Sequence, residues 1–265
     1  MNEDLMRDPV PFATSQPTVV VPDPVLSPHH AKGEKIARMV HEGQRSVPAD
    51  PPLLVCKPKT IESWRVFKIL SEFIEGFDII RRYGLAVTFF GSARATVGNR
   101  LYSDAEELAG KLAKKGFAVI TGGSAGIMQA ANKGAFQVGG ASVGLNIDLP
   151  QTQEYNPYLT EKFGFHHFFV RKVMLTYASE VYVYFPGGFG TLDEFFEIIT
   201  LVQTKKIRKI PIILYGKDYW APLIAFFEKT LYEERKAIDK EDMDLYKVVD
   251  TVEEAFEYIT ANVTC

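Results

Sequence analysis

The sequence has little cysteine and no long apolar run. Only Cys56 and Cys265 occur in 265 residues, and they lie far apart. Two isolated thiols supply neither a disulfide framework nor a zinc cluster, so we expect a reducing, cytoplasmic environment. No apolar stretch approaches the ~20 residues that span a bilayer, and residues 1–51 carry no apolar segment of the secretory type. We therefore expect no membrane partner.

Neither sign of charge dominates the chain. Thirty basic and 33 acidic residues leave a formal net charge of −3. This balance argues against the broad basic face with which proteins bind nucleic acid, although a local positive pocket is compatible with it. We therefore expect no nucleic-acid partner. The length accommodates one α/β domain with a well-filled core, plus appendages.

The first part of the chain lacks sustained hydrophobic periodicity. Residues 1–57 are rich in proline, serine and charge, which predicts a flexible N-terminal extension. Residues 58–265 are predicted to form a single domain. Within it, apolar residues at helical spacing predict an N-terminal helix over 60–83 that Gly84 ends. A helix this apolar must cover its own domain or a partner subunit.

After Gly84, short apolar runs alternate with helical segments. Strands are predicted over 85–90, 117–120, 141–147, 165–170, 181–185 and 210–215. Helices are predicted over 103–115, from 127 to about 138, over 171–179, from the glycines after 186 to about 204, and over 219–232 and 252–260; Ser103 and Glu106 form a capping box in the first of these. The alternation predicts a Rossmann-like, doubly wound α/β fold: a mostly parallel sheet with helices on both faces, plus the N-terminal helical extension.

Three glycine-rich loops follow predicted strands, where such sheets bind ligands. In the first, Gly91 lets the backbone approach a ligand, and Arg94 has the reach to contact a phosphate or a sugar. A tight turn with a surface arginine is the alternative interpretation. The second loop, 121–128, aims backbone N–H groups and a helix N-terminus at an anion. It has neither the G-x-G-x-x-G spacing of dinucleotide sites nor the lysine of a Walker loop.

The third loop, 186–194, is the most informative. Three glycines, the hydroxyl of Thr191 and a helix N-terminus together predict a phosphate site. Asp193 and Glu194 follow, predicted in the first turn of that helix. They either complement the helix dipole or, in the case of Glu194, serve catalysis.

Together the three loops resemble the signature loops of the Lonely Guy (LOG) family, long mislabelled as lysine decarboxylases. The Pro-Gly-Gly-x-Gly-Thr-x-x-Glu pattern of that family occurs at 186–194, and the preceding Arg-Lys pair occurs at Arg171 and Lys172. The resemblance covers about 84–232. It implies a hydrolase, a phosphoribohydrolase that releases the base from cytokinin riboside 5′-monophosphates or, as an AMP nucleosidase, from AMP.

The resemblance also implies roles for individual residues. Arg171 and Glu194 are the expected catalytic pair. The expected phosphate-binding residues are Gly187, Gly188, Gly190 and Thr191. The expected nucleotide pocket comprises Gly91, Ser92, Arg94, Gly122, Gly123, Gly126, Met128 and Lys172. Longer family members often carry glutamate where this chain has Gln129, an amide that can hydrogen-bond a sugar hydroxyl but cannot act as a base. The resemblance further implies a homo-oligomer, a dimer or higher.

Two alternatives to the hydrolase are considered, a carrier and a decarboxylase. A non-catalytic nucleotide or molybdenum-cofactor carrier of the same fold would use the same phosphate loop without needing the acid at Glu194. A decarboxylase would need pyridoxal phosphate on a lysine, and nothing marks Lys172 as that residue. We expect no cofactor. We also expect no metal, because His166 and His167 have no acidic or cysteine partner at ligand spacing in the sequence.

Overall fold

The computed structural model describes residues 63–148 and 155–263. The predicted extension over 1–57 lies outside the described residues. The predicted N-terminal helix is present as α2, Ser63–Ile80.

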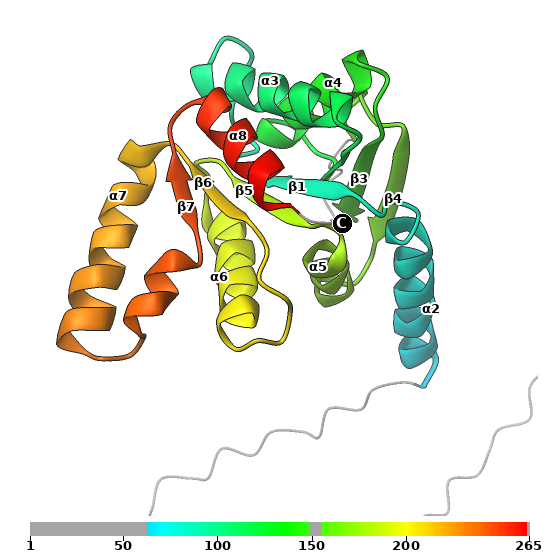
Figure 1. The fold of residues 1–265 in the computed structure, drawn as a ribbon. Coiled ribbons are helices and arrows are strands. Elements are labelled where there is room, and N and C mark those ends of the chain that lie inside the picture. Colours follow the sequence, from blue (N-terminus) through cyan, green and yellow to red (C-terminus); the bar gives the residue numbers. More distant parts are fainter. Residues whose placement is uncertain (1–62, 149–154, 264–265) are drawn as a thin grey trace, which may run out of the picture. The chain divides into compact units, whose positions relative to one another are not determined.

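A seven-stranded sheet forms the centre of the domain (Figure 1). Its spatial order is β4-β3-β2-β1-β5-β6-β7, and every pairing is parallel. The strands are β1 (Ala86–Phe90), β2 (Ala118–Thr121), β3 (Ser142–Ile147), β4 (Glu161–Phe165), β5 (Val181–Tyr184), β6 (Ile212–Tyr215) and β7 (Lys247–Val249). The chain runs outward from β1 in one direction and from β5 in the other, so β1 and β5 flank the switch point where such sheets bind ligands.

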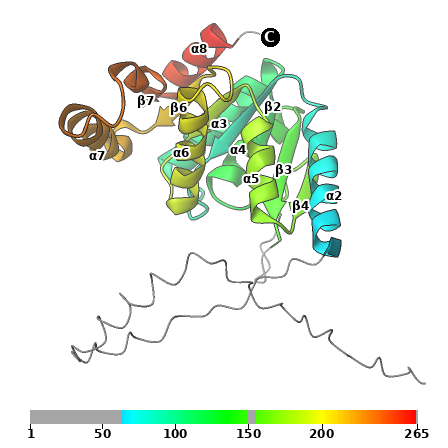
Figure 2. The same cartoon turned by 90° about the horizontal axis from the view of Figure 1, so that it is seen from below.

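Helices cover both faces of this sheet. One face carries α3 (Arg100–Lys114), α4 (Ile127–Gln137) and α8 (Val252–Asn262). The other carries α2, α5 (Phe168–Tyr177), α6 (Phe189–Gln203) and α7 (Lys217–Phe226), which continues into the π-helix η2 (Phe227–Glu234) before the 3₁₀ helix η3 (Lys240–Asp244). Seen from below, α6, α5 and α2 lie side by side (Figure 2). The predicted Rossmann-like, doubly wound fold is confirmed.

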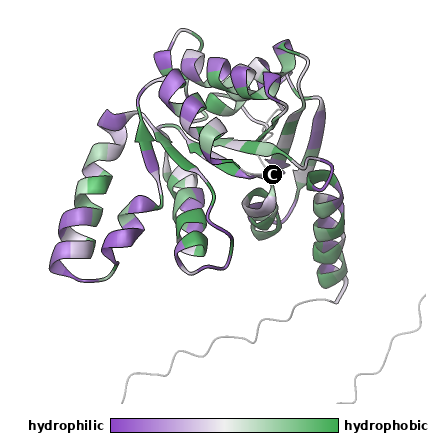
Figure 3. Ribbon diagram, in the orientation of Figure 1, coloured by the Kyte–Doolittle hydropathy of each residue, from purple (hydrophilic) through white to green (hydrophobic). Residues whose placement is uncertain are grey.

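Alternate strand residues supply two separate cores. Val87 and Phe89 of β1 pack under α3 and α4, whereas Phe90 packs on the opposite face with Tyr182 and Tyr184 of β5. Burial on both faces explains why the central strands appear as continuous apolar runs. In Figure 3 hydrophobic colour runs along the central strands and also along α2 and α6, whereas α3 carries much hydrophilic colour.

Predicted boundaries in two regions of the chain are wrong, around β4 and α5 and at the start of α3. The strand predicted over 165–170 is β4, which ends at Phe165, and the following helix begins at Phe168 rather than 171. Short apolar runs do not distinguish a strand from a helix start, and here the exposed Phe168 and Phe169 belong to the helix. Helix α3 begins at Arg100, where the side chain of Asn99 accepts the Leu101 N–H, so the Ser103 capping box does not begin it.

Candidate active site

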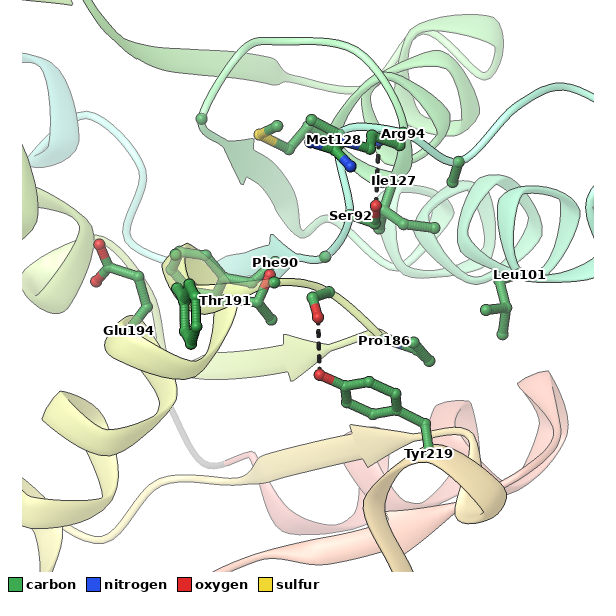
Figure 4. Close-up of a pocket in the computed structure, with 18 of the residues that line it drawn as sticks. Phe90, Ser92, Arg94, Leu101, Ile127, Met128, Pro186, Thr191, Glu194 and Tyr219 are labelled. Carbon is green, nitrogen blue, oxygen red and sulfur yellow. Dashed lines mark hydrogen bonds between the residues drawn. The ribbon is translucent and has the colours of Figure 1, made fainter. Parts of the chain in front are cut away.

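A pocket of about 840 Å³ opens at the carboxyl ends of the central strands, where the three glycine loops meet (Figure 4). This is an ordinary volume for a small-molecule site. The predicted site residues that line it are Gly91, Ser92, Arg94, Gly122, Met128, Arg171, Gly187, Gly188, Gly190, Thr191 and Glu194. Thr191 and Glu194 project from α6 on one side, and Met128 and Arg94 lie on the opposite side. Gly123, Gly126 and Lys172 do not line the pocket.

Backbone hydrogen bonds join the three loops through Ser92. The Ser92 N–H donates to Pro186 O at 3.0 Å, and the Ile127 N–H donates to Ser92 O at 3.0 Å. The Ser92 hydroxyl accepts the Arg94 N–H at 3.1 Å. Gly126 makes this approach possible, because its φ is +72° and a Cβ there would lie 2.1 Å from Ser92 O. Gly126 thus affects the shape of the site without lining the pocket.

The third loop leads directly into α6. A Cβ on Gly187 would lie 2.1 Å from Thr191 Oγ1, so only glycine lets the loop close over that hydroxyl. Gly188 occupies the N-cap position, and no side chain caps the helix, which leaves its first N–H groups available to an anion. The Tyr219 hydroxyl donates to Gly187 O at 2.8 Å and holds the loop from the other side. The loop therefore has the geometry of a phosphate site.

Glu194 places a buried carboxylate in this pocket. It is 5% exposed, and burial raises its pKa to about 7, against the opposing charges of Lys172 and Arg171. Because α6 begins at Phe189, the prediction that Asp193 and Glu194 occupy its first turn is wrong. The helix dipole acts mainly within the first turn, so it does not account for an acid at Glu194.

Arg171 lines the pocket from α5. Its Nε donates to Leu145 O at 2.8 Å, which fixes the guanidinium against the end of β3. A Cβ on Gly122 would lie 2.6 Å from Arg171 Nη2, so that glycine makes room for the arginine. Burial lowers the pKa of Arg171, and the charge of Glu194 opposes this. Among the described residues no ion pair within 4.0 Å joins Arg171 to Glu194.

Lys172 lies behind Glu194 rather than in the pocket. Its Nζ is 2.7 Å from Asp193 Oδ2, 2.7 Å from Glu197 Oε2 and 4.0 Å from Glu194 Oε2. Three carboxylates of α6 therefore share one lysine of α5. Sequence reasoning did not single out Glu197, although its spacing from Asp193 places both on one face of the helix.

Two exposed aromatic residues at the pocket were not expected. Phe189, the first residue of α6, is 92% exposed, and Phe168, the first residue of α5, is 52% exposed. The ring centre of Phe168 is 5.9 Å from the guanidinium carbon of Arg171. Large apolar side chains in water beside a pocket offer surfaces on which a planar base can stack. Phe189 lies within the 186–194 motif and Phe168 lies three residues before Arg171, and these positions were the available signal.

The residues that the structure describes contain no group of three or more histidine, cysteine, aspartate or glutamate residues suited to hold a metal ion. None of their helices has the length and hydrophobicity to cross a bilayer.

Comparison with known proteins gives related sequences and related folds. The family model described as "Possible lysine decarboxylase" matches residues 128–259. The chain is 32% identical over 160 residues to a probable cytokinin riboside 5′-monophosphate phosphoribohydrolase of Arabidopsis thaliana, covering 57% of this chain and 76% of the relative. It is 27% identical over 153 residues to the cytokinin riboside 5′-monophosphate phosphoribohydrolase of Rhodococcoides fascians, covering 56% and 76%.

Two solved structures share the fold. The molybdenum cofactor binding protein of Rippkaea orientalis matches with a TM-score of 0.50 and 20% identity, covering 67% of this chain and 94% of that chain. The molybdenum cofactor carrier protein of Chlamydomonas reinhardtii matches with a TM-score of 0.50 and 21% identity, covering 67% and 96%. At these identities the similarity concerns the fold alone.

Proposed function

The chain belongs to the Lonely Guy (LOG) family, and from this premise we propose that it hydrolyses the N-glycosidic bond of a purine nucleoside 5′-monophosphate. The products are the free base and ribose 5-phosphate, and the candidate substrates are cytokinin riboside 5′-monophosphates and AMP. The observation that carries the proposal is the buried carboxylate of Glu194 in a pocket that also holds a glycine-rich helix N-terminus. A site that only binds phosphate does not need a buried carboxylate such as that of Glu194.

The third loop is the proposed phosphate site. Backbone N–H groups at the start of α6 and the Thr191 hydroxyl suit the 5′-phosphate, and the helix dipole favours its charge. Phosphate binding supplies energy remote from the bond that breaks, which fixes the sugar relative to Glu194. A strong preference for 5′-monophosphates over free nucleosides follows.

Glu194 is the proposed catalytic carboxylate. As the bond between C1′ and the base nitrogen breaks, positive charge develops on the sugar and the electron pair leaves with the base. The ionised Glu194 stabilises that positive charge and accepts a proton from the water that adds to C1′. The proton then passes to the departing base, which completes the hydrolysis. A pKa of about 7 suits a group that both accepts and returns a proton near neutral pH.

Arg171 is the proposed partner of Glu194 in catalysis. Its fixed guanidinium lies in the same pocket and keeps its charge throughout the physiological range. It favours the ionised form of Glu194 against the effect of burial, and it is placed to contact the substrate. Ser92, Arg94, Gly122 and Met128 are the proposed remaining contacts of the nucleotide.

We also propose a homo-oligomer and a cytoplasmic location. Helix α2 exposes an apolar face to solvent, which a second copy of the chain is proposed to cover. The cytoplasmic location rests on the isolated cysteines.

The proposal is tested by incubating the purified chain with AMP, isopentenyladenosine 5′-monophosphate and adenosine, and by following free base by chromatography. Base release from the monophosphates alone is expected. Glu194→Gln should lose about 10²- to 10⁴-fold in rate, the usual contribution of a general acid or base, and Arg171→Ala should also be impaired. Intact monophosphates that stay tightly bound would contradict hydrolysis and favour a carrier built on the same loop.

A further inference from the structure

Helix α2 places one buried carboxylate, Glu72, against the start of α5. Glu72 is 8% exposed, whereas Glu75 of the same helix is exposed. Its Oε1 accepts the N–H of His166 at 3.1 Å, and its Oε2 accepts the N–H of His167 at 3.1 Å. The imidazole Nδ1 atoms of the two histidines lie 3.2 and 3.1 Å from Oε1.

This carboxylate caps α5 from outside the helix. His167 is the N-cap residue, and its own side chain makes no capping hydrogen bond. Glu72 accepts the N–H of this N-cap residue and of the residue before it, and it places a negative charge at the helix N-terminus, where the helix dipole favours it. The carbonyl of His167 accepts the N–H of Arg171 at 3.2 Å. One residue therefore connects Glu72 on α2 to the backbone of Arg171.

A close packing contact lies one turn further along α2. A Cβ on Gly76 would lie 2.6 Å from Met174 Sδ and 3.1 Å from Phe165 Cε1, so only glycine lets α2 approach α5 and the end of β4 this closely. Figure 2 shows α2 and α5 side by side. Glu72 and Gly76, four residues apart, lie on one face of the helix and hold α5 at two points.

We propose that Glu72 is a positioning residue for the active site, holding the first turn of α5 so that Arg171 faces the pocket. The inference rests on the proposed function for its catalytic consequence. Although burial raises the pKa of the Glu72 carboxyl, the hydrogen bonds from His167 and His166 outweigh this and hold that pKa below its usual value. The third loop follows β5 and has no contact with Glu72 among the described hydrogen bonds. Loss of Glu72 is therefore expected to leave the phosphate site in place.

The test compares Glu72→Ala and Glu72→Gln with Glu75→Ala. Glu75 is the matched control, because it lies on the same helix and its carboxylate accepts only the Ser71 hydroxyl among the described contacts. With AMP, Glu72→Ala should lower kcat by about 10- to 100-fold, as misplacement of a catalytic group by about 1 Å does, with KM little changed. Glu72→Gln keeps one acceptor oxygen and should show a smaller loss. Glu75→Ala should match the parent.

Hydrogen exchange supplies a readout that needs no activity. The amides of the first turn of α5 should exchange about tenfold or more faster in Glu72→Ala, reflecting easier local opening, and at the parent rate in Glu75→Ala. Parental exchange and parental kcat in folded Glu72→Gln and Glu72→Ala would overturn the inference. A parent chain that hydrolyses no monophosphate would contradict the proposed function instead, and the exchange comparison would still decide whether Glu72 holds α5.

Discussion

Glu194 combines two opposing demands at the level of a single residue. Catalysis needs its charge, whereas its burial disfavours that charge and raises its pKa to about 7. Lys172 and Arg171 oppose the effect of burial, and Lys172 acts from only 4.0 Å. The charge of this acid therefore costs folding energy, as is common at functional sites.

This cost predicts how stability depends on pH. The folded chain keeps a proton on Glu194 up to about pH 7, whereas the unfolded chain releases it near the ordinary value of 4.5. Between these values the unfolded state binds fewer protons, so the free energy of unfolding falls as the pH rises. Glu194→Gln should therefore raise that free energy at pH 8 by up to about 3 kcal/mol and change it little near pH 4.

Urea unfolding of both chains at pH 4, 6 and 8 measures this difference. Glu257→Gln is the control, because Glu257 is an exposed acid of α8. The free energy of unfolding of Glu257→Gln should equal that of the parent at each pH. A Glu194→Gln variant with the same pH dependence as the parent would show that the carboxylate carries no such cost.

At the scale of elements, the meeting of the three loops depends on the backbone of Gly126. Ala at Gly126 would combine a φ of +72° with a Cβ 2.1 Å from Ser92 O. Gly139 has a similar φ of +74° and nothing within 4 Å of its Cβ position. Gly139→Ala should cost about 1–2 kcal/mol in stability, the usual penalty of a left-handed residue. Gly126→Ala should cost more and weaken binding of the monophosphate, as unfolding and titration calorimetry would measure; equal losses in stability would contradict the clash.

The sequence predicted some elements well and others poorly, for physical reasons. The step from β5 through the third loop to α6 was clear, because a buried apolar run gives way to glycines and then to helical spacing. Strand β7 was missed, since it has three residues and only Val249 is buried. Glu72 was missed because its partners are backbone N–H groups of His166 and His167, distant in sequence. Glu75 and Asp78 lie in the same helix, so the acid at position 72 did not stand out in the sequence.

At the scale of the whole molecule, α2 has two apolar faces. One faces the domain: Gly76 packs against Met174 of α5, and Ile79 and Ile80 are buried in the core. The other is exposed at Phe67, Leu70, Ile74 and Phe77, with exposed fractions of 62, 50, 64 and 44%. Their spacing of three, four and three residues is that of a helix packing against another helix. Such a contiguous apolar face is unusual on a monomer.

This outer face predicts that Ile74→Glu lowers the oligomeric state. A charge at the centre of an apolar interface would be buried without a partner, which strongly disfavours association. Light scattering coupled to size-exclusion chromatography should give a multiple of the 29.8 kDa chain mass for the parent and a smaller species for Ile74→Glu.

Lys68→Glu, at an exposed polar position of the same helix, should keep the parental mass. Because Ile74 is 64% exposed, Ile74→Glu should leave the fold of the single chain intact, so its circular dichroism should match the parent. A monomeric parent, or an unchanged mass in Ile74→Glu, would show that a second copy of the chain does not cover this face.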